Sequence, residues 1–234
     1  MSISASATFD QYAESYDEAL DAGISISGED RNFFAHGRIR WLSSMLPTAR
    51  VKAVMDYGCG TGTATPFLLD LLGAERVLGV DISEKSLAQA RRTHREPRVS
   101  FAQIEQYEPR EEFDLAFCNG VFHHIPVGER AASVAYIYRS LKPGGLFAFW
   151  ENNPWNPGAR YAMWRCPFDQ DAVALAPPAA RRLLRSSGFE IQTTSFLFIF
   201  PRVLGFMRGI EPHVARWPLG AQYQVLCRKP LRSK

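Results

Sequence analysis

Three glycines within five residues follow a short apolar run that ends in a carboxylate. The run covers residues 51–57 and contains Asp56, and the glycines are Gly58, Gly60 and Gly62. Glycine lets the backbone approach a ligand closely, and a helix that starts directly after such a turn offers unpaired N–H groups to an anion. A helical pattern does follow, over residues 63–72. This layout of strand, glycine turn and helix predicts a nucleotide-type site at the edge of a parallel sheet.

The acid ahead of the turn indicates which ligand suits this site. A dinucleotide fingerprint, G-x-G-x-x-G, requires its third glycine at position 63, where the chain has Thr63. A carboxylate at Asp56 would repel a pyrophosphate, whereas it suits a ligand that carries an ammonium or a sulfonium group. S-adenosylmethionine carries both groups and has no phosphate, and its own carboxylate can use the N–H groups of the turn.

A second carboxylate lies at the end of the next predicted strand, residues 76–80. Asp81 follows Gly62 by 19 residues and is followed by Ile82. A carboxylate at this place can bind the two ribose hydroxyls of a nucleoside. Because NAD sites share this feature, Asp81 alone supports a nucleoside cofactor without deciding which one.

Together, Asp56, the G-x-G-x-G turn and Asp81 resemble the class I (Rossmann-like) S-adenosylmethionine-dependent methyltransferases of the small-molecule type. The resemblance covers roughly residues 8–230 in the order of the elements. It implies an α/β fold with a doubly wound, seven-stranded, mostly parallel sheet of order 3-2-1-4-5-7-6, in which the last strand is antiparallel. It also implies S-adenosyl-L-methionine as the methyl donor and S-adenosyl-L-homocysteine as the product.

The same resemblance implies further contacts with the cofactor. In the family, an acid after the third strand lies near the adenine amine, and Glu105 is the aligned residue here. The backbone at the position of Asn119 often holds the methionine ammonium. The N-terminal segment often forms a helical lid, in which Tyr16 would border the cofactor and Tyr12 the acceptor. The alternative is an aromatic stripe that packs on the body of the domain.

Two histidines follow the fourth predicted strand, in the loop that begins at Asn119. Because the carboxyl ends of the strands line the ligand crevice of a doubly wound sheet, this loop should lie beside the methyl donor. We expect His124 or His123 to help deprotonate the acceptor, with a structural role for His124 at a helix start as the alternative. Glu151, at the end of the fifth strand, is a second candidate base. The sequence shows no metal-ligand spacing, and no metal is expected.

The segment 151–176, after the fifth strand, is rich in aromatic residues, proline and asparagine. Loops at this edge of such a sheet carry specificity, so we expect the segment to form part of the acceptor pocket. The candidate contacts with the acceptor are Trp155, Arg160, Tyr161 and Arg165. Packing of the aromatic side chains onto the core is an equally simple explanation for them.

The whole chain of 234 residues is expected to form one methyltransferase domain, because its length and its 46% hydrophobic content suit a single α/β core. We expect N-terminal helices and a lid in residues 1–47, the cofactor-binding core in 48–150, and substrate-side insertions at 151–176 and 201–219. The spacing also predicts a helix that begins at Ser27.

Cysteine usage and the absence of a leader bear on the compartment. The cysteines are far apart in sequence, which favours free thiols in a reducing environment; they are Cys59, Cys118, Cys166 and Cys227. The chain shows neither a signal-peptide pattern nor an apolar run of the ~20 residues that a membrane span needs. A cytoplasmic protein is therefore expected.

Three functions are compatible with these observations. The first is methyl transfer, by in-line displacement, to a small-molecule acceptor such as a natural product or a lipid- or glycan-related metabolite. The second is methylation of RNA or protein, which would need a basic groove or a recognition domain; at a net charge of +3 neither stands out, and no nucleic-acid partner is expected. The third is a scaffold that binds the cofactor without turnover. The methylated atom and the oligomeric state are not predicted.

Overall fold

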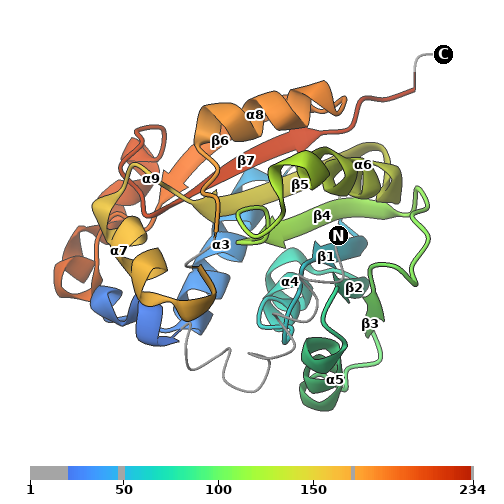
Figure 1. The fold of residues 1–234 in the computed structure, drawn as a ribbon, viewed down its shortest axis with the longest axis horizontal. Helices are drawn as coiled ribbons and strands as arrows, with labels where there is room; N and C mark the ends of the chain where they lie inside the picture. The colour runs from blue at the N-terminus through green and yellow to red at the C-terminus, as the bar shows by residue number, and fades with distance from the viewer. Residues whose placement is uncertain (1–20, 47–50, 170–171, 233–234) are drawn as a thin grey trace.

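A seven-stranded sheet runs through the protein (Figure 1). The computed structural model describes residues 21–46, 51–169 and 172–232. The strand order is β3-β2-β1-β4-β5-β7-β6; the pairs from β3 to β5 are parallel, and β7 is antiparallel to both of its neighbours. The predicted α/β class, the strand order and the antiparallel last strand are therefore confirmed.

Strands and helices alternate along most of the chain, as in a doubly wound sheet, and β3 and β4 follow one another without a helix between them. The strands are β1 (Ala53–Tyr57), β2 (Arg76–Asp81), β3 (Val99–Gln103), β4 (Phe113–Asn119), β5 (Leu141–Asn152), β6 (Glu190–Leu197) and β7 (Gln222–Arg228). The α-helices are α3 (Arg31–Met45), α4 (Thr65–Leu72), α5 (Glu84–Thr93), α6 (Arg130–Ser140), α7 (Pro157–Arg165), α8 (Pro177–Ser186) and α9 (Glu211–Val214). The 3-10 turns are η1 (Ser25–Ser27), η2 (Val127–Glu129), η3 (Pro167–Asp169) and η4 (Arg202–Ile210).

Two apolar layers hold the sheet between helices. On one face the sheet packs against α6 and α8 through fully buried side chains such as Ile137 and Leu184, and Figure 1 shows these two helices side by side. The other face packs against α3 and α4 through Ile39 and Leu68. A parallel sheet needs such cover on both faces, because its strands are apolar on both sides.

The start of α3 differs from the prediction. Ser27 does not cap this helix; the carboxylate of Asp30 does, accepting a hydrogen bond from the backbone N–H of Phe33 at 2.8 Å. The reason is that η1 ends at Gly28, whose φ of 75° turns the chain before the helix begins. Asp30 is therefore the residue that reaches the first turn of α3.

The apolar pattern of the sequence predicts a fifth strand over residues 146–150 and a sixth over residues 189–200, and the structure gives both strands other bounds. β5 begins at Leu141, which pairs with Phe113 of β4. The next pair is Leu115 with Leu146, so the register shifts between the two pairs, where β5 contains the Lys-Pro-Gly-Gly turn. β6 ends at Leu197 because the next residue, Phe198, has a φ of 63°, which interrupts the ladder. The backbone N–H groups of Phe198, Ile199 and Phe200 donate instead to the buried carboxylate of Glu211, at 3.0–3.1 Å.

The four cysteines are buried and unpaired, as expected for free thiols. None of the helices in the described parts of the chain has the length and apolar character needed to cross a membrane.

Candidate cofactor and acceptor site

The glycine turn after β1 lies against the end of β2. The backbone N–H groups of Gly58 and Cys59 both donate to the carbonyl of Val80, at 2.7 and 3.1 Å. Gly58 has a φ of 71°, and a Cβ atom there would lie 2.3 Å from a methyl group of Val121. Position 58 therefore requires glycine both for its backbone conformation and for the close approach of the loop after β4.

Asp81 ties this turn to the start of α5. Its carboxylate accepts hydrogen bonds from the backbone N–H groups of Gly60 and Ser83, both at 2.9 Å. The side chain lines what we call the turn pocket, together with Gly58, Gly60, Ile82, Ser86, Ile104, Asn119, Gly120, Val121 and His124.

Asp56 lies at the end of β1 with only 3% of its surface exposed. Its Oδ2 atom has no hydrogen-bond partner in the described parts of the chain, and neither has the buried Oδ1 atom of Asn119. Burial, and secondarily the nearby Asp81, raise the pKa of Asp56 from 3.8 to about 7. A cationic ligand beside this carboxyl would satisfy the oxygen and favour its ionised form.

The other residues predicted to contact the cofactor lie in different places. Ile82 and Asn119 line the turn pocket. Glu105 is exposed, and its neighbour Ile104 forms the pocket wall in its place. Gly62 is buried with a φ of 81°, and a Cβ atom there would come within 2.8 Å of the His94 ring, so its glycine is explained by packing. Tyr12 and Tyr16 lie outside the described residues, and their roles stay predictions.

A larger cavity of about 340 Å³ adjoins the turn pocket. Its walls come from residues 23–38, from α7 and from residues 198–201 after β6, segments that are far apart in the sequence. The two hollows share Asn119, Gly120 and His124. A ligand in the larger cavity would therefore lie next to a ligand in the turn pocket, as two reactants must.

The insertion after β5 contributes one face of α7 to the larger cavity. The side chains on that face are Ala159, Ala162 and Met163, and Cys166, directly after the helix, continues it. Their spacing of three, one and three residues is that of a helix face, and this pattern would have found them in the sequence.

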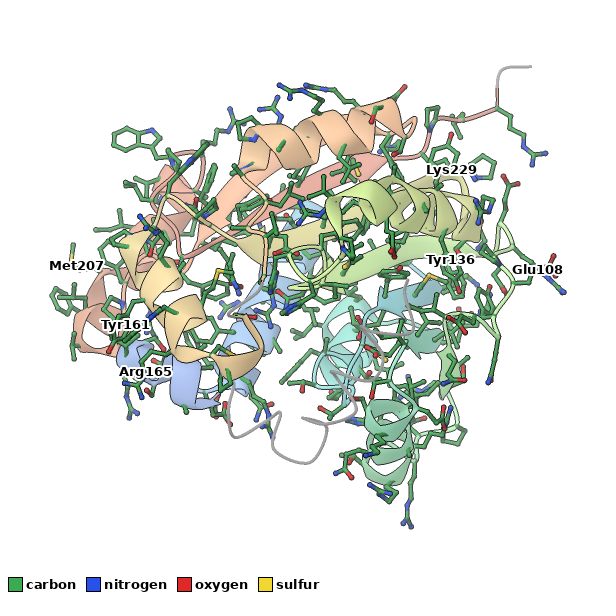
Figure 2. The ribbon with its side chains drawn as sticks, viewed as in Figure 1. Glu108, Tyr136, Tyr161, Arg165, Met207 and Lys229 are labelled. Atoms are coloured by element: carbon green, nitrogen blue, oxygen red, sulfur yellow. The ribbon has the colours of Figure 1, made fainter. Side chains whose placement is uncertain are left out.

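The four residues predicted to contact the acceptor lie elsewhere on the insertion. Arg160, Tyr161 and Arg165 on α7, and Trp155 before it, are exposed and are not part of the cavity wall (Figure 2 labels Tyr161 and Arg165). The cavity gives no support to their predicted role, which stays a prediction.

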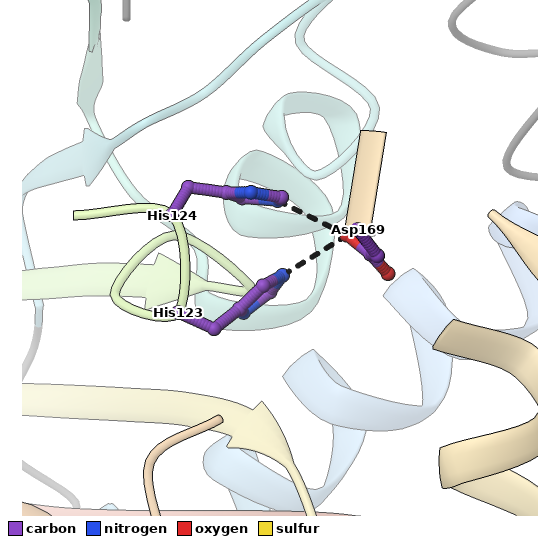
Figure 3. Close-up of side chains that lie close together, drawn as sticks. All are labelled: His123, His124 and Asp169. Carbon is purple, nitrogen blue, oxygen red and sulfur yellow. Dashed lines mark hydrogen bonds and ion pairs between the residues drawn. The ribbon is translucent and has the colours of Figure 1, made fainter. Parts of the chain in front are cut away.

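Two histidines from the loop after β4 converge on a carboxylate of the insertion at the wall of the larger cavity (Figure 3). Oδ1 of Asp169 lies 3.3 Å from Nε2 of His123 and 3.2 Å from Nε2 of His124. On the far side of His123, Nδ1 lies 2.6 Å from Oε2 of Glu151. The other oxygen of Glu151 accepts from the backbone N–H of Phe122 at 2.7 Å. The result is a chain of contacts from Glu151 through His123 to Asp169 and His124.

The pKa values of the two histidines shift in opposite directions. Burial alone would lower the pKa of His123, but the carboxylates of Glu151 and Asp169 raise it to about 10. Burial lowers the pKa of His124, and Asp169 offsets this only in part. Burial would raise the pKa of Asp169, but hydrogen bonds from both rings hold it at about 2. In the protein alone, His124 is therefore the ring that keeps a lone pair at neutral pH.

The three candidate bases thus occupy different places. His124 lies on the walls of both hollows, and His123 lies on the wall of the larger cavity. Glu151, 1% exposed, touches His123 and is not part of either wall, so in this position it orients a histidine. Asp169 was not predicted, because it lies 45 residues beyond His124 and no local pattern marks it.

The sequence profile of a methyltransferase domain family matches residues 54–145, from β1 to the turn inside β5. This part of the chain is a class I S-adenosylmethionine-dependent methyltransferase domain. A solved neighbour with the same fold is an S-adenosylmethionine-dependent methyltransferase from Mesorhizobium loti, at a TM-score of 0.61 and 23% identity, over 83% of this chain and 99% of that one.

Two relatives of this methyltransferase carry the name trans-aconitate 2-methyltransferase. The protein from Methylobacterium nodulans is 33% identical over 168 residues, which are 70% of this chain and 61% of that protein. The protein from Rhizobium etli is 28% identical over 202 residues, 76% of each chain. The chain thus spans less than two thirds of the length of the Methylobacterium relative.

The turn pocket of this methyltransferase fits S-adenosylmethionine, the cofactor of the family. The free oxygen atoms of Asp56 and Asn119 suit its ammonium group. The carboxylate of Asp81, on the wall of the same pocket, suits its ribose hydroxyls.

Proposed function

We propose that this methyltransferase transfers a methyl group from S-adenosylmethionine to a small molecule that carries an acid group. The observation that supports this proposal is the larger cavity beside the turn pocket. Its volume of about 340 Å³ is within the range of small-ligand sites. The shared wall formed by Asn119, Gly120 and His124 would bring the acceptor next to the methyl donor.

Arginine side chains on the cavity wall support an anionic acceptor. Arg38 is buried and donates a hydrogen bond to Oε1 of Gln222 at 2.8 Å. Arg31 and Arg208, which form ion pairs with Asp21 and Glu29, also line the cavity. A guanidinium group is the side chain that best matches the planar geometry of a carboxylate. The names of the two trans-aconitate methyltransferases point to the same class of acceptor, a small carboxylic acid.

The chemistry divides between the cofactor and the chain. When bound, S-adenosylmethionine supplies a methyl group that is already activated by its sulfonium sulfur. The residues of the chain then have to hold two molecules in line, which can be worth ~7–11 kcal/mol. Asp56, Asn119 and Asp81 would hold one partner. His124 is placed to accept a proton where the acceptor is a hydroxyl, which adds roughly 10²–10⁴-fold; a carboxylate acceptor has no proton to lose.

Calorimetry with S-adenosylmethionine, followed by a methylation assay, tests this proposal. We expect binding by the wild-type protein and at least tenfold weaker binding by Asp81→Ala, because hydrogen bonds to a charged group are worth ~1.5–3 kcal/mol. An unchanged dissociation constant in this variant would refute the ribose assignment.

The assay should then compare small carboxylic acids, small hydroxyl compounds, RNA and protein as acceptors. We expect turnover with acids. Turnover with RNA or protein alone would favour the second function considered from the sequence, and cofactor binding without any turnover would favour a scaffold. A cytoplasmic location remains the expectation from the sequence.

A further inference from the structure

The cluster formed by His123, His124 and Asp169 has the geometry of a metal site. The three side chains offer one ligand atom each, and these atoms lie within 4.8 Å of one another. Oδ1 of Asp169 is 3.3 Å from one Nε2 atom and 3.2 Å from the other. Around a metal bonded at about 2.0–2.2 Å, tetrahedral ligands would be about 3.3–3.5 Å apart. The two separations from Asp169 therefore match those between the ligands of a tetrahedral metal site.

The hydrogen bonds around His123 point in the same direction. The two oxygens of Glu151 face the backbone N–H of Phe122 and Nδ1 of His123, so Nδ1 carries the proton that this contact needs. Nε2 on the other side of the ring faces Oδ1 of Asp169 at 3.3 Å, and without a metal ion it can donate a proton to that oxygen. A metal ion would take the place of this proton, with Nε2 and the carboxylate oxygen as two of its ligands. A carboxylate that holds the outer nitrogen of a histidine is the usual support for a metal ligand.

The surroundings supply room for an open coordination position. All three residues lie on the wall of the larger cavity, so the side of the cluster away from the protein faces the proposed acceptor. Catalytic metal sites have this form, with three protein ligands and one position left for substrate or water. Two imidazole nitrogens with one carboxylate oxygen favour zinc, iron(II) or cobalt over magnesium or calcium.

We propose that His123, His124 and Asp169 bind one divalent transition-metal ion, with Glu151 as the residue that orients His123. This inference rests on the proposed function, because the open position would take an oxygen atom of the acceptor and fix it beside the methyl donor. It also changes the role of His124, which then acts as a metal ligand and not as a general base. No local sequence pattern indicates the site, because its third ligand lies on a distant segment.

Cobalt(II) is the probe for the test, because its visible absorption reports both binding and geometry. The purified full chain is treated with a chelator, dialysed and titrated with cobalt(II), and zinc is then added to displace it. We expect one equivalent of cobalt per chain. Asp169→Asn and His124→Ala should each lose cobalt binding by at least tenfold, and Glu151→Gln should weaken it about 10- to 100-fold, the range for residues that support a ligand.

The matched control replaces two histidines outside the cavity, His36 on α3 and His213 on α9, both of which are exposed. The double variant His36→Ala/His213→Ala should bind cobalt like the wild type. Circular dichroism of every variant shows whether it is folded. If Asp169→Asn alone fails to fold, the milder His124→Gln decides, since its amide cannot replace the imidazole nitrogen in a tetrahedral site.

Two results would overturn the metal site. One is a folded wild-type protein that binds no cobalt or zinc, with NMR signals that show a proton on Nε2 of His123. The other is cobalt binding that survives both Asp169→Asn and the histidine variant. Asp81→Ala separates this inference from the proposed function: it should lose S-adenosylmethionine binding and keep cobalt binding, so each can fail without the other.

Discussion

Asp56 carries an electrostatic cost that its ligand would remove. Its pKa of about 7 in the folded protein lies above the ordinary value of 3.8, so between these pH values the folded chain holds a proton that the unfolded chain has lost. Without the cofactor, the contribution of Asp56 to stability therefore falls as the pH rises through this window. A bound ammonium group favours the charged carboxylate and offsets the cost.

Replacing Asp56 with asparagine should therefore stabilise the free protein and weaken cofactor binding. At pH 8 we expect Asp56→Asn to gain at least ~1 kcal/mol, which is about 2–4 °C in Tm for a chain of this size. The gain should shrink towards pH 5, where the wild-type carboxyl is already neutral. Calorimetry should show at least tenfold weaker binding of S-adenosylmethionine, because the charge that faces its ammonium is gone.

The control for this experiment is Asp70→Asn, which changes an exposed acid on α4 in the same way. It should alter neither Tm nor cofactor affinity. Equal melting curves and equal affinities for Asp56→Asn and the wild type would show that the buried acid does not face the donor.

How well single residues could be predicted depends on how locally their environment is encoded. The positions of three residues could be predicted because one strand, one turn and the next strand determine them within a short stretch of sequence; these residues are Asp56, Gly58 and Asp81. Asp169 could not be found in this way, because its partners come from the loop after β4. Residues 160 and 161 looked suited to ligand binding by type alone, but the side of α7 on which they lie is set by tertiary packing.

The two sides of α7 are expected to respond differently to substitution. Ala162 lines the larger cavity, whereas Tyr161, its neighbour, is exposed. Ala162→Leu should fill part of the cavity and raise the KM for a small-acid acceptor several-fold, with an unchanged dissociation constant for S-adenosylmethionine, because the turn pocket is not altered. Steady-state kinetics and calorimetry measure the two quantities.

Tyr161→Ala is the matched control on the same helix and should leave both values unchanged. The opposite outcome, a large effect of Tyr161→Ala with none from Ala162→Leu, would return acceptor binding to the residues expected from the sequence and remove the larger cavity from that role.

Glu211 at the start of α9 holds the segment that follows β6. Its two oxygens accept three backbone N–H groups, from Phe198, Ile199 and Phe200, and all three of these residues line the larger cavity. In Glu211→Gln an amide N–H₂ group replaces one of these acceptors. We expect a loss of roughly 1.5–3 kcal/mol in the free energy of unfolding, the value for hydrogen bonds to a charged group.

Denaturant unfolding and hydrogen exchange at residues 198–200 test this role of Glu211. Glu190→Gln, at an exposed acid where β6 begins, is the control and should unfold like the wild type. If exchange at residues 198–200 is unchanged in Glu211→Gln, the carboxylate does not hold the segment.

At the scale of elements, the order of strands and helices was predictable because each strand ends in a recognisable turn. The residues at which individual strands and helices begin and end were harder to predict. β6 looked longer in sequence because residues 196–200 are uniformly apolar, but the positive φ of Phe198 and the carboxylate of Glu211 end the ladder at Leu197. α3 begins after Ser27 because a glycine turn intervenes.

At the scale of the molecule, the two hollows differ in how the chain builds them. The turn pocket is formed largely by the ends of β1, β2 and β4 and by the loops that follow them, and so its main features could be predicted. The larger cavity needs residues 23–38, α7 and residues 198–201 at once. No single stretch of sequence carries the shape of such a cavity, so its lining could be known only from the folded chain.

The wall formed by Asn119, Gly120 and His124 has a thermodynamic consequence. Because both occupants would touch these residues, an acid that tightens the binding of S-adenosylhomocysteine must itself be tightened by the same factor, typically 5- to 150-fold. Calorimetry in both orders of addition measures this coupling, and fully independent binding would argue against adjacent occupants. A single compound in which a nucleoside is linked to an acid could occupy the turn pocket and the larger cavity at once. Its affinity would show how well the two sites are aligned with each other.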